Sequence, residues 1–249
     1  MRSRPDIPQE VVRALREARH VVVLTGAGVS AESGVPTFRD AQTGLWERYS
    51  PQELATPEAF DRDPELVWEW YAWRRELVAG AEPNAGHRAL AKLERHAPRF
   101  TLVTQNVDGL HRRAGSRNVI EYHGSLFRTV CRSEGAVVEG WSEEQTPPRC
   151  PDCGDYLRPD VVWFGEMLPV AAIERSLVAA GECAVLLSVG TSSLVQPAAS
   201  LPQEALLRGV PVVEINPEET PLTRRATYSL RGTSGSVLPE LVRAAWPVE

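Results

Sequence analysis

Polar side chains that could perform acid–base chemistry follow two predicted strands. Gln105, Asn106 and Asp108 come directly after the apolar run at 100–104. In open α/β sheets ligands bind at the carboxyl ends of the strands, so these side chains indicate a binding site. His123 ends the next short apolar run, and the pKa of histidine suits a general base near neutral pH. A single histidine at such a place is more often structural, so the residues alone leave its role open.

A glycine loop follows the buried strand predicted at 20–24. Gly26 and Gly28 stand where a chain turning towards a phosphate has to expose backbone N–H groups without interference from a Cβ atom. This pattern indicates a nucleotide site. The next glycine is Gly34, which does not fit the spacing of the dinucleotide fingerprint, and no acidic residue closes that fingerprint at its usual distance. A hydride-transferring dehydrogenase is therefore a poor interpretation.

Three of the four cysteines have the spacing of a metal site. Cys150 and Cys153 form a Cys-x2-Cys knuckle, and two such pairs hold zinc tetrahedrally. Cys131 begins the other pair, but Glu134 stands where a second cysteine would complete it. Two interpretations remain open: a zinc site in which Glu134 can ligate through oxygen, and a metal-free module packed by its own side chains. Cys183 opens an apolar strand and is expected in the core.

The clearest predicted helix begins after Asp63-Pro64 and ends at Gly80. Tyr71 and Arg74 project from one side of it, three residues apart, on a half-apolar face. The ordinary interpretation is a surface arginine whose stem lies on apolar neighbours. The alternative is a pocket, because an arginine inside an apolar tunnel is unfavourable unless a ligand supplies an anionic partner.

Strands and helices alternate along most of the chain, which predicts an α/β fold with a Rossmann-like, doubly wound parallel sheet. One helical segment and one cysteine-bearing segment interrupt this alternation. We expect them to form a smaller zinc-ribbon-like and helical insert domain within one catalytic region, 1–249. The predicted boundaries are 7–39, 85–127 and 158–249 for the Rossmann-like domain, and 40–84 and 128–157 for the small domain. Single elements are predicted as helices at 7–19, 84–96 and 170–180, a helix ending at Gly209, a last helix from Pro239, and strands at 119–124, 184–190 and 210–215.

The composition is that of an ordinary globular protein, with 43% hydrophobic and 24% charged residues. A net charge of −6 argues against binding to nucleic acid or to an anionic membrane, both of which favour basic surfaces. No apolar run reaches membrane-spanning length, and the N-terminal stretch carries acidic residues and lacks the apolar core of a signal peptide. We expect a cytoplasmic protein without nucleic-acid or membrane partners, acting as a monomer.

Several motifs, in the same order along the chain, resemble the NAD-dependent protein deacylases, the sirtuins. The string TGAGVSAESGVPTFRD, from Thr25 to Asp40, carries the resemblance most specifically. The stretches from Thr104 to His111 and from Tyr122 to Ser125 match further sirtuin motifs. The resemblance covers about residues 21–241 and is closest to the desuccinylase-type branch, which includes bacterial CobB-like enzymes.

The resemblance implies that NAD is a co-substrate held by the glycine loop and the strand ends. Its implied contacts are Gly26, Ala27, Gly28, Ser30, Glu32, Pro36, Thr37, Phe38, Arg39, Trp46, Gln105, Asn106, Val107, Asp108, Gly190, Thr191, Ser192, Asn216, Pro217, Glu218 and Ser234. The implied catalytic residues are His123, Asn106 and Asp108. An acyl-lysine peptide would lie as an added strand between two segments, with implied contacts at Val162, Phe164, Gly165, Glu166, Leu194 and Val195. A structural zinc ion would be held by Cys131, Cys150 and Cys153.

The implied activity is removal of acyl groups from protein lysines, in which NAD is consumed and nicotinamide, O-acyl-ADP-ribose and free lysine are released. Tyr71 and Arg74 match the pair that marks the desuccinylase-type branch, which implies removal of succinyl and malonyl as well as acetyl groups. A mono-ADP-ribosyltransferase that uses the same NAD site is the alternative. An NAD-binding module without catalysis is disfavoured, because Asn106, Asp108 and His123 occur together.

Overall fold

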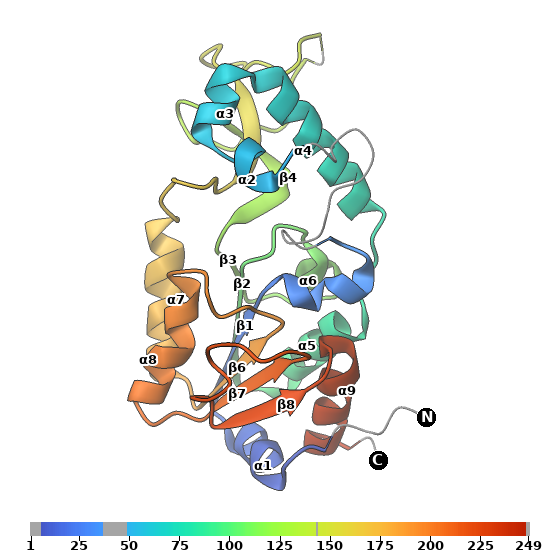
Figure 1. Ribbon diagram of the computed structural model, residues 1–249, viewed down its shortest axis with the longest axis vertical. Helices are drawn as coiled ribbons and strands as arrows, with labels where there is room; N and C mark the ends of the chain where they lie inside the picture. Colours follow the sequence, from blue (N-terminus) through green and yellow to red (C-terminus); the bar gives the residue numbers. More distant parts are fainter. Residues whose placement is uncertain (1–5, 37–48, 143, 248–249) are drawn as a thin grey trace.

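Six parallel strands form the central sheet, in the order β3-β2-β1-β6-β7-β8 (Figure 1). The computed structural model describes residues 6–36, 49–142 and 144–247. The strands are β1 His20–Thr25, β2 Arg99–Thr104, β3 Val119–Glu121, β6 Val185–Val189, β7 Val212–Asn216 and β8 Tyr228–Arg231. The strand order reverses between β1 and β6, because the chain runs from β1 outwards to β3 and then returns to β6. Sheets of this kind bind ligands at such a switch point.

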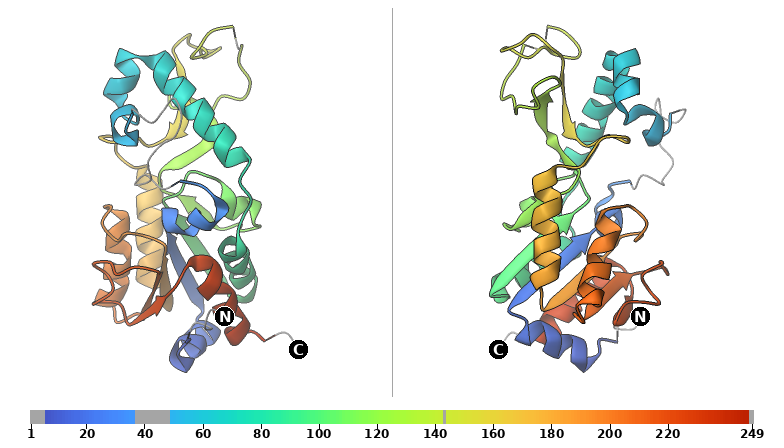
Figure 2. Two further views of the ribbon diagram at one scale, coloured as in Figure 1. Left: turned by 45° about the vertical axis from the view of Figure 1, so that its right-hand side comes forward. Right: turned by 90° about the vertical axis from the view of Figure 1, so that its left-hand side faces the viewer.

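Helices cover both faces of this sheet (Figure 2). One face carries α1 Gln9–Glu17, α5 Ala85–His96 and α9 Ser234–Ala245, and the other carries α7 Val170–Glu182 and α8 Leu201–Leu207. Val21 and Val23 of β1 pack into the first layer, and Val22 and Leu24 into the second. Because both faces are buried, β1 is a continuous apolar run and does not alternate. The predicted doubly wound α/β fold is confirmed.

A small antiparallel sheet and three helices lie beyond the carboxyl ends of the parallel strands (Figure 1). These elements are α2 Pro51–Leu54, α3 Pro57–Arg62, α4 Pro64–Ala79, β4 Gly124–Cys131 and β5 Leu157–Val161. Their shared core contains large aromatic side chains, among them Phe60, Trp70, Tyr71 and Trp163. The sequence pattern did not predict β4 and β5 as separate strands.

Side-chain caps start two of the helices of this small part. The carboxylate of Asp63 accepts a hydrogen bond from the N–H of Leu66 at 3.0 Å at the start of α4. Ser50 and Glu53 form a capping box: each backbone N–H donates to the other's side chain, at 2.9 and 3.2 Å. α4 ends directly before Gly80, as predicted.

The prediction that the last helix starts at Pro239 is wrong. α9 begins at Ser234 and contains Pro239. The carboxylate of Glu32 holds its start, accepting from the N–H of Gly235 at 2.7 Å and from the hydroxyl of Thr233 at 2.9 Å. A negative charge at a helix N-terminus is favourable. This partner stands 203 residues before Gly235, so no local pattern indicates it.

Other element ends also shift from their predicted places. β3 ends at Glu121 and not at 124, because β2 ends at its partner, Thr104. α8 ends at Leu207, and the left-handed Gly209 follows it (φ 73°). β8 was not predicted. In the described part of the chain, the remaining short helices are η1 Ala27–Val29, η2 Ala31–Ser33, α6 Leu110–Arg113 and η4 Ala198–Ser200.

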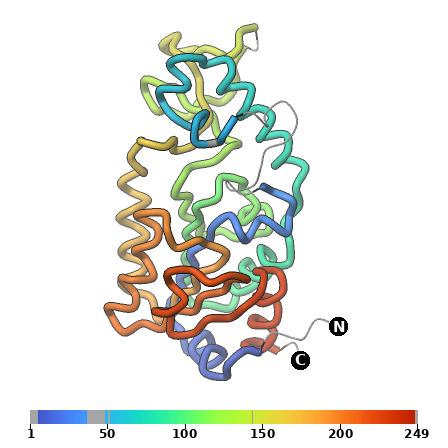
Figure 3. Tube along the Cα trace, in the orientation of Figure 1, coloured from blue at the N-terminus to red at the C-terminus, as the bar shows by residue number. Residues whose placement is uncertain are grey.

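The first and last described helices meet at the end of the molecule opposite the small sheet (Figure 3). Nε of Arg16, in α1, donates to the carbonyl oxygen of Ala245, in α9, at 2.5 Å. Within the described ranges, no helix combines the length and apolar character needed to cross a membrane.

Replacement of Gly124 by alanine tests the junction between the two sheets. Gly124 is left-handed (φ 79°), and a Cβ atom there would lie 2.0 Å from the carbonyl oxygen of Asp160. Gly209 is also left-handed but has nothing within 4 Å of that position. We expect Gly209→Ala to lower the free energy of unfolding by about 1–2 kcal/mol. Gly124→Ala should lower it by about 2–5 kcal/mol, since the clash adds to the backbone strain. Equal losses of unfolding free energy in the two variants, measured by urea unfolding, would show that the junction between the sheets relaxes to remove the clash.

Candidate active site

Two loops cross in close contact at the carboxyl edge of the sheet, one after β1 and one after β6. The N–H of Gly26 donates to the carbonyl oxygen of Val189 at 3.2 Å, and that of Gly28 to the oxygen of Gly190 at 2.9 Å. A Cβ atom at Gly26 or Gly28 would lie 2.9 or 2.8 Å from the Gly190 oxygen. The two positions require glycine because another backbone passes there. The predicted reason, N–H groups exposed to a phosphate, does not hold for these two residues.

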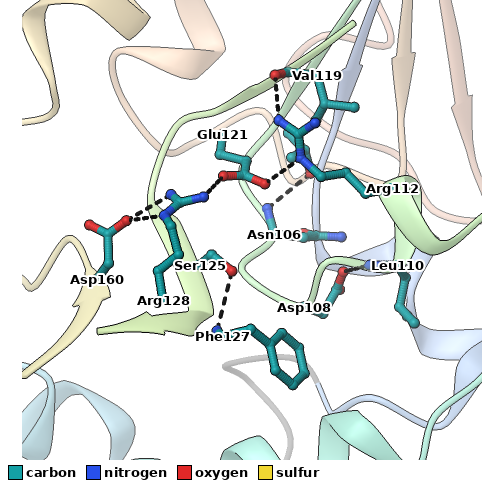
Figure 4. Close-up of polar contacts among 11 residues, drawn as sticks. Asn106, Asp108, Leu110, Arg112, Val119, Glu121, Ser125, Phe127, Arg128 and Asp160 are labelled. Carbon is teal, nitrogen blue, oxygen red and sulfur yellow. Dashed lines mark hydrogen bonds and ion pairs between the residues drawn. The ribbon is translucent and has the colours of Figure 1, made fainter. Parts of the chain in front are cut away.

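The hydroxyl of Ser30 is the centre of a buried polar cluster. It donates to Oδ2 of Asp108 at 2.6 Å and accepts from Nδ2 of Asn106 at 3.1 Å. Oδ1 of Asp108 accepts from the N–H of Leu110 at 2.9 Å (Figure 4). Burial raises the pKa of Asp108, and the hydrogen bond from Ser30 opposes this shift. The cluster therefore fixes the carboxylate through both of its oxygens.

His87 completes this cluster from α5, and its proton position follows from its partners. The N–H of Asn84 donates to Nδ1 at 3.3 Å, so the ring proton resides on Nε2. Nε2 lies 3.4 Å from the Ser30 hydroxyl oxygen. Burial lowers the pKa of His87 to about 4, which keeps the ring neutral. Sequence reasoning missed His87; the signal was a polar residue on the apolar face of a predicted helix.

The side-chain amide of Asn106 has a single orientation. Nδ2 donates to the carbonyl oxygen of Gly26 and to the hydroxyl of Ser30, both at 3.1 Å. These bonds use both hydrogens of the amide, so the side chain offers a ligand only its Oδ1 acceptor. Its backbone N–H donates to Oγ1 of Thr104 at 3.1 Å. Asn106 is thus held from both its main chain and its side chain.

His123 lies two residues beyond the end of β3 and is held in one tautomer. Its Nδ1 lies 2.9 Å from the carbonyl oxygen of Gln105. A carbonyl can only accept, so Nδ1 carries the proton and Nε2 is the basic nitrogen. Burial lowers the pKa of His123, and the Gln105 carbonyl partly opposes this. The ring is therefore a neutral base at neutral pH.

An ion-pair network fixes the chain on both sides of His123 (Figure 4). Glu121, at the end of β3, accepts from Nε of Arg112 at 2.9 Å and from Arg128 at 2.6 Å. Arg128, in β4, also donates from Nε to Asp160 of β5 at 2.7 Å. The network joins the parallel sheet to the small sheet across the segment that carries His123.

A second buried chain of hydrogen bonds supports the backbone of Asn106 through the Thr104 hydroxyl. The hydroxyl of Thr25 donates to that of Thr104 at 2.9 Å and lies 3.0 Å from Nε2 of His111. Because the single Thr25 hydrogen is used, Nε2 of His111 must be the donor to Thr25. Burial lowers the pKa of His111 well below its ordinary value, so the ring stays neutral.

Several residues predicted to contact NAD come together around Thr191. Nε2 of Gln105 donates to the Thr191 hydroxyl at 3.2 Å, and Nδ2 of Asn216 donates to the Thr191 carbonyl at 2.9 Å. The N–H of Glu218 donates to Oδ1 of Asn216 at 3.2 Å. The other predicted residues of these loops and of the α9 start are Ala27, Gly190, Ser192, Pro217 and Ser234.

Some predicted contacts lie apart from this group. Thr37, Phe38, Arg39 and Trp46 lie outside the described residues. Pro36 is exposed at the edge of the described part. Val107 is buried, and its carbonyl oxygen accepts from the N–H of Leu126 at 2.9 Å.

Tyr71 and Arg74 lie on α4 within the aromatic core of the small part. Tyr71 is 3% exposed, and Nε of Arg74 is buried. The guanidinium carbon of Arg74 lies 4.9 Å from the centre of the Trp70 ring. The interpretation of Arg74 as a surface arginine is therefore wrong. Burial lowers the pKa of Arg74 and raises that of Tyr71 to about 12. An anionic ligand group would stabilise such a charge.

The segment predicted to border a peptide lies directly beside His123. The N–H of Val162 donates to the His123 carbonyl at 3.0 Å, and that of Phe164 to the carbonyl of Ala55 at 2.8 Å. The carboxylate of Glu166 is turned towards Arg158. On both predicted borders the structure exposes residues of the predicted contact set, namely Phe164, Gly165, Leu194 and Val195.

The thiols of Cys131, Cys150 and Cys153 gather in one group, with all sulfurs within 4.8 Å of one another. Cys131 and Cys153 are 3.3 Å apart, and the hydroxyl of Ser133 lies 3.4 Å from the Cys131 sulfur. The Ser133 hydroxyl and the Glu134 N–H lower the pKa of Cys131 to about 7, which favours the thiolate. Three thiolates fit a zinc ion that would cross-link the two loops.

Two alternatives for the cysteines are decided by their positions. Among the described residues, the Glu134 carboxylate is not part of the sulfur group, so the interpretation of Glu134 as the fourth ligand is not supported. Cys183 is buried beside α7, and its thiol faces the Ala180 carbonyl oxygen at 3.2 Å. Its predicted place in the core is confirmed.

The molecule joins a doubly wound sheet, which has oriented polar groups at its switch point, to a small sheet with a thiol cluster. This combination is typical of a class of nucleotide-dependent enzymes. The Sir2 family model matches residues 26–197. An NAD-dependent protein deacylase of Archaeoglobus fulgidus is 54% identical over 94% of this chain and 96% of its own. The chain belongs to the Sir2 family.

Solved structures agree with this assignment. A Sir2 homologue in complex with NAD superposes with a TM-score of 0.90 at 51% identity, covering 98% of this chain and 96% of that one. A Sir2 complex with a p53 peptide and NAD has a TM-score of 0.83 at 32% identity, covering 94% of this chain and 97% of that one.

The metal content tests the thiol cluster. We expect purified protein to contain one zinc per chain by elemental analysis. Cys150→Ser should lose the metal because it removes a ligand, and Glu134→Ala should keep it because that carboxylate lies outside the group. Protein without metal, or loss of zinc in Glu134→Ala, would contradict this assignment.

Proposed function

We propose that the protein is an NAD-dependent protein-lysine deacylase that removes succinyl, malonyl and acetyl groups. The tautomer of His123 carries the proposal: its Nδ1–H points at the Gln105 carbonyl, which leaves a basic Nε2 next to the loop of Asn106 and Asp108. The deacylase relative and the NAD-bound homologue support the same activity. No comparison favours the mono-ADP-ribosyltransferase alternative.

NAD supplies an ADP-ribosyl group whose bond to nicotinamide breaks and whose ribose receives the acyl group. Oδ1 of Asn106 is the acceptor available to orient the nicotinamide amide or a ribose hydroxyl. The Ser30–Asp108 pair holds a buried carboxylate close by. Nε2 of His123 accepts the proton of a ribose hydroxyl as it attacks the acyl carbon. The loops around Thr191 and Asn216 would hold the adenosine half.

The proposed substrate preference rests on the residues of the small sheet and its helices. An acyl-lysine side chain would enter beside His123, with its peptide between the 162–166 and 194–195 segments as an added strand. Tyr71 and Arg74 would face the far end of the acyl group. A guanidinium and a phenol together suit the distal carboxylate of a succinyl or malonyl chain, and the apolar surroundings also accept acetyl.

The proposal also covers the domain boundaries, the remaining NAD contacts, the cellular location and the oligomeric state. The domain boundaries given above separate an NAD-binding part from a small part, and the remaining contacts to NAD are those named from the sequence. Free thiols at Cys131, Cys150, Cys153 and Cys183 suit the reducing cytoplasm. A monomeric state stays a prediction.

Mass spectrometry of acyl-lysine peptides tests the activity directly. Acetyl-, malonyl- and succinyl-lysine forms of one peptide are incubated with the protein, with and without NAD. We expect deacylated peptide, nicotinamide and O-acyl-ADP-ribose in equal amounts, and only when NAD is present. NAD consumption without an acyl peptide, with ADP-ribose attached to protein, would instead identify an ADP-ribosyltransferase.

Replacement of His123 by alanine should separate binding from turnover. We expect NAD affinity, measured by calorimetry, to stay nearly unchanged, and kcat to fall by about a hundredfold or more, because the base is lost. In the natural protein, kcat/KM should fall as pH drops through the His123 pKa, which burial places below 6.5. Deacylation by the variant near the natural rate would refute the role of His123 as base.

Replacement of Arg74 by methionine tests the acyl preference. Loss of a charge-assisted contact should lower desuccinylation by roughly ten- to a hundredfold and spare deacetylation. Arg75→Met is the matched control: Arg75 donates to the Leu126 carbonyl at 2.9 Å and has a structural role. It should leave the ratio of the two activities unchanged. An equal fall of both activities in Arg74→Met would make Arg74 structural too.

A further inference from the structure

The hydroxyl of Tyr71 has one hydrogen-bond partner among the described residues, the indole of Trp163. Nε1 of Trp163 lies 3.0 Å from the Tyr71 oxygen. An indole N–H can only donate, so the phenol oxygen accepts in this contact. The hydrogen of the Tyr71 hydroxyl is therefore not used within the described part of the chain. A donor this deeply buried calls for an acceptor.

The indole of Trp163 is buried and held by several neighbours. Trp163 is 2% exposed. The guanidinium carbon of Arg158 lies 3.3 Å from the centre of its ring, and the Phe60 ring centre lies at 5.3 Å. Its backbone N–H donates to Glu166 at 2.8 Å, and Glu166 also accepts from Arg158 at 2.5 Å. The direction of the Nε1–H bond is thus set by packing and by an ion pair.

This contact has a consequence for Arg74, which stands one turn after Tyr71 on α4. A phenol oxygen with no other donor would be a natural partner for a buried guanidinium. Trp163 already donates to that oxygen. Burial raises the pKa of Tyr71 to about 12, so the hydroxyl keeps its hydrogen at physiological pH.

We propose that Trp163 is a positioning residue for acyl selection: by donating to the Tyr71 oxygen, it directs the phenol hydrogen towards the distal carboxylate of a dicarboxylic acyl-lysine. This inference rests on the proposed function. It assigns the selectivity to three residues, with Tyr71 and Arg74 contacting the carboxylate and Trp163 acting through Tyr71. The carboxylate of Glu166 has a supporting part, since it anchors both Trp163 and Arg158.

The test compares kcat/KM for succinyl- and acetyl-lysine forms of one peptide. The sharpest variant replaces Trp163 with benzothienylalanine, an isostere in which sulfur takes the place of the N–H group and packing is kept. Trp163→Phe serves as the genetic variant. We expect the succinyl-to-acetyl ratio to fall by roughly three- to tenfold, because the succinyl reaction loses more than the acetyl reaction.

A double-mutant cycle with Tyr71→Phe distinguishes a positioning role from a structural one. If Trp163 acts through Tyr71, its replacement lowers desuccinylation no further once the phenol is gone. Full additivity, or an unchanged ratio in the isostere, overturns the inference while the deacylase function stands. A natural protein without desuccinylase or demalonylase activity overturns both the inference and the acyl part of the proposed function.

Discussion

The site depends on the close approach of two backbones, that of the loop after β1 and that of the loop after β6. Gly26 and Gly28 lie so near Gly190 that a single Cβ atom would separate them. The hydrogen bonds across this crossing use backbone groups, so they do not depend on the nature of other side chains. The crossing sets where Ser30 stands, and Ser30 in turn orients Asn106 and Asp108.

Hydrogen bonds from neighbouring backbone groups and from Thr25 also determine which nitrogen of each histidine carries a proton. The backbone of Asn84 sets the tautomer of His87, the Gln105 carbonyl sets that of His123, and Thr25 sets that of His111. His87 and His111 are neutral donors within the cluster, and burial keeps them so. His123 differs because its second nitrogen is not committed to these contacts. His123, which is only partly buried, therefore has different chemistry from the fully buried His87 and His111.

The strands and the local caps were predictable, because their causes lie within a few residues. The apolar run of β1, the capping box of Ser50 and Glu53, and the cap at Asp63 each have a local signal. The polar residues after β2 were found for the same reason. The start of α9 and strands β4, β5 and β8 could not be placed, since they depend on partners far away in sequence. The role of Trp163 was hidden because its donor group meets Tyr71 from 92 residues away.

The anchoring of α9 by Glu32 also limits the order in which the chain can be completed during synthesis. Glu32 leaves the ribosome 203 residues before its partner Gly235. Until then its carboxylate lacks the N–H groups that hold it, and the faces of α5 and β7 that α9 covers are open. Glu32 therefore reaches its final contacts only when nearly the whole chain has been made. Chains interrupted before α9 leave open the apolar faces of α5 and β7 that α9 packs against, which makes them targets for chaperones and aggregation.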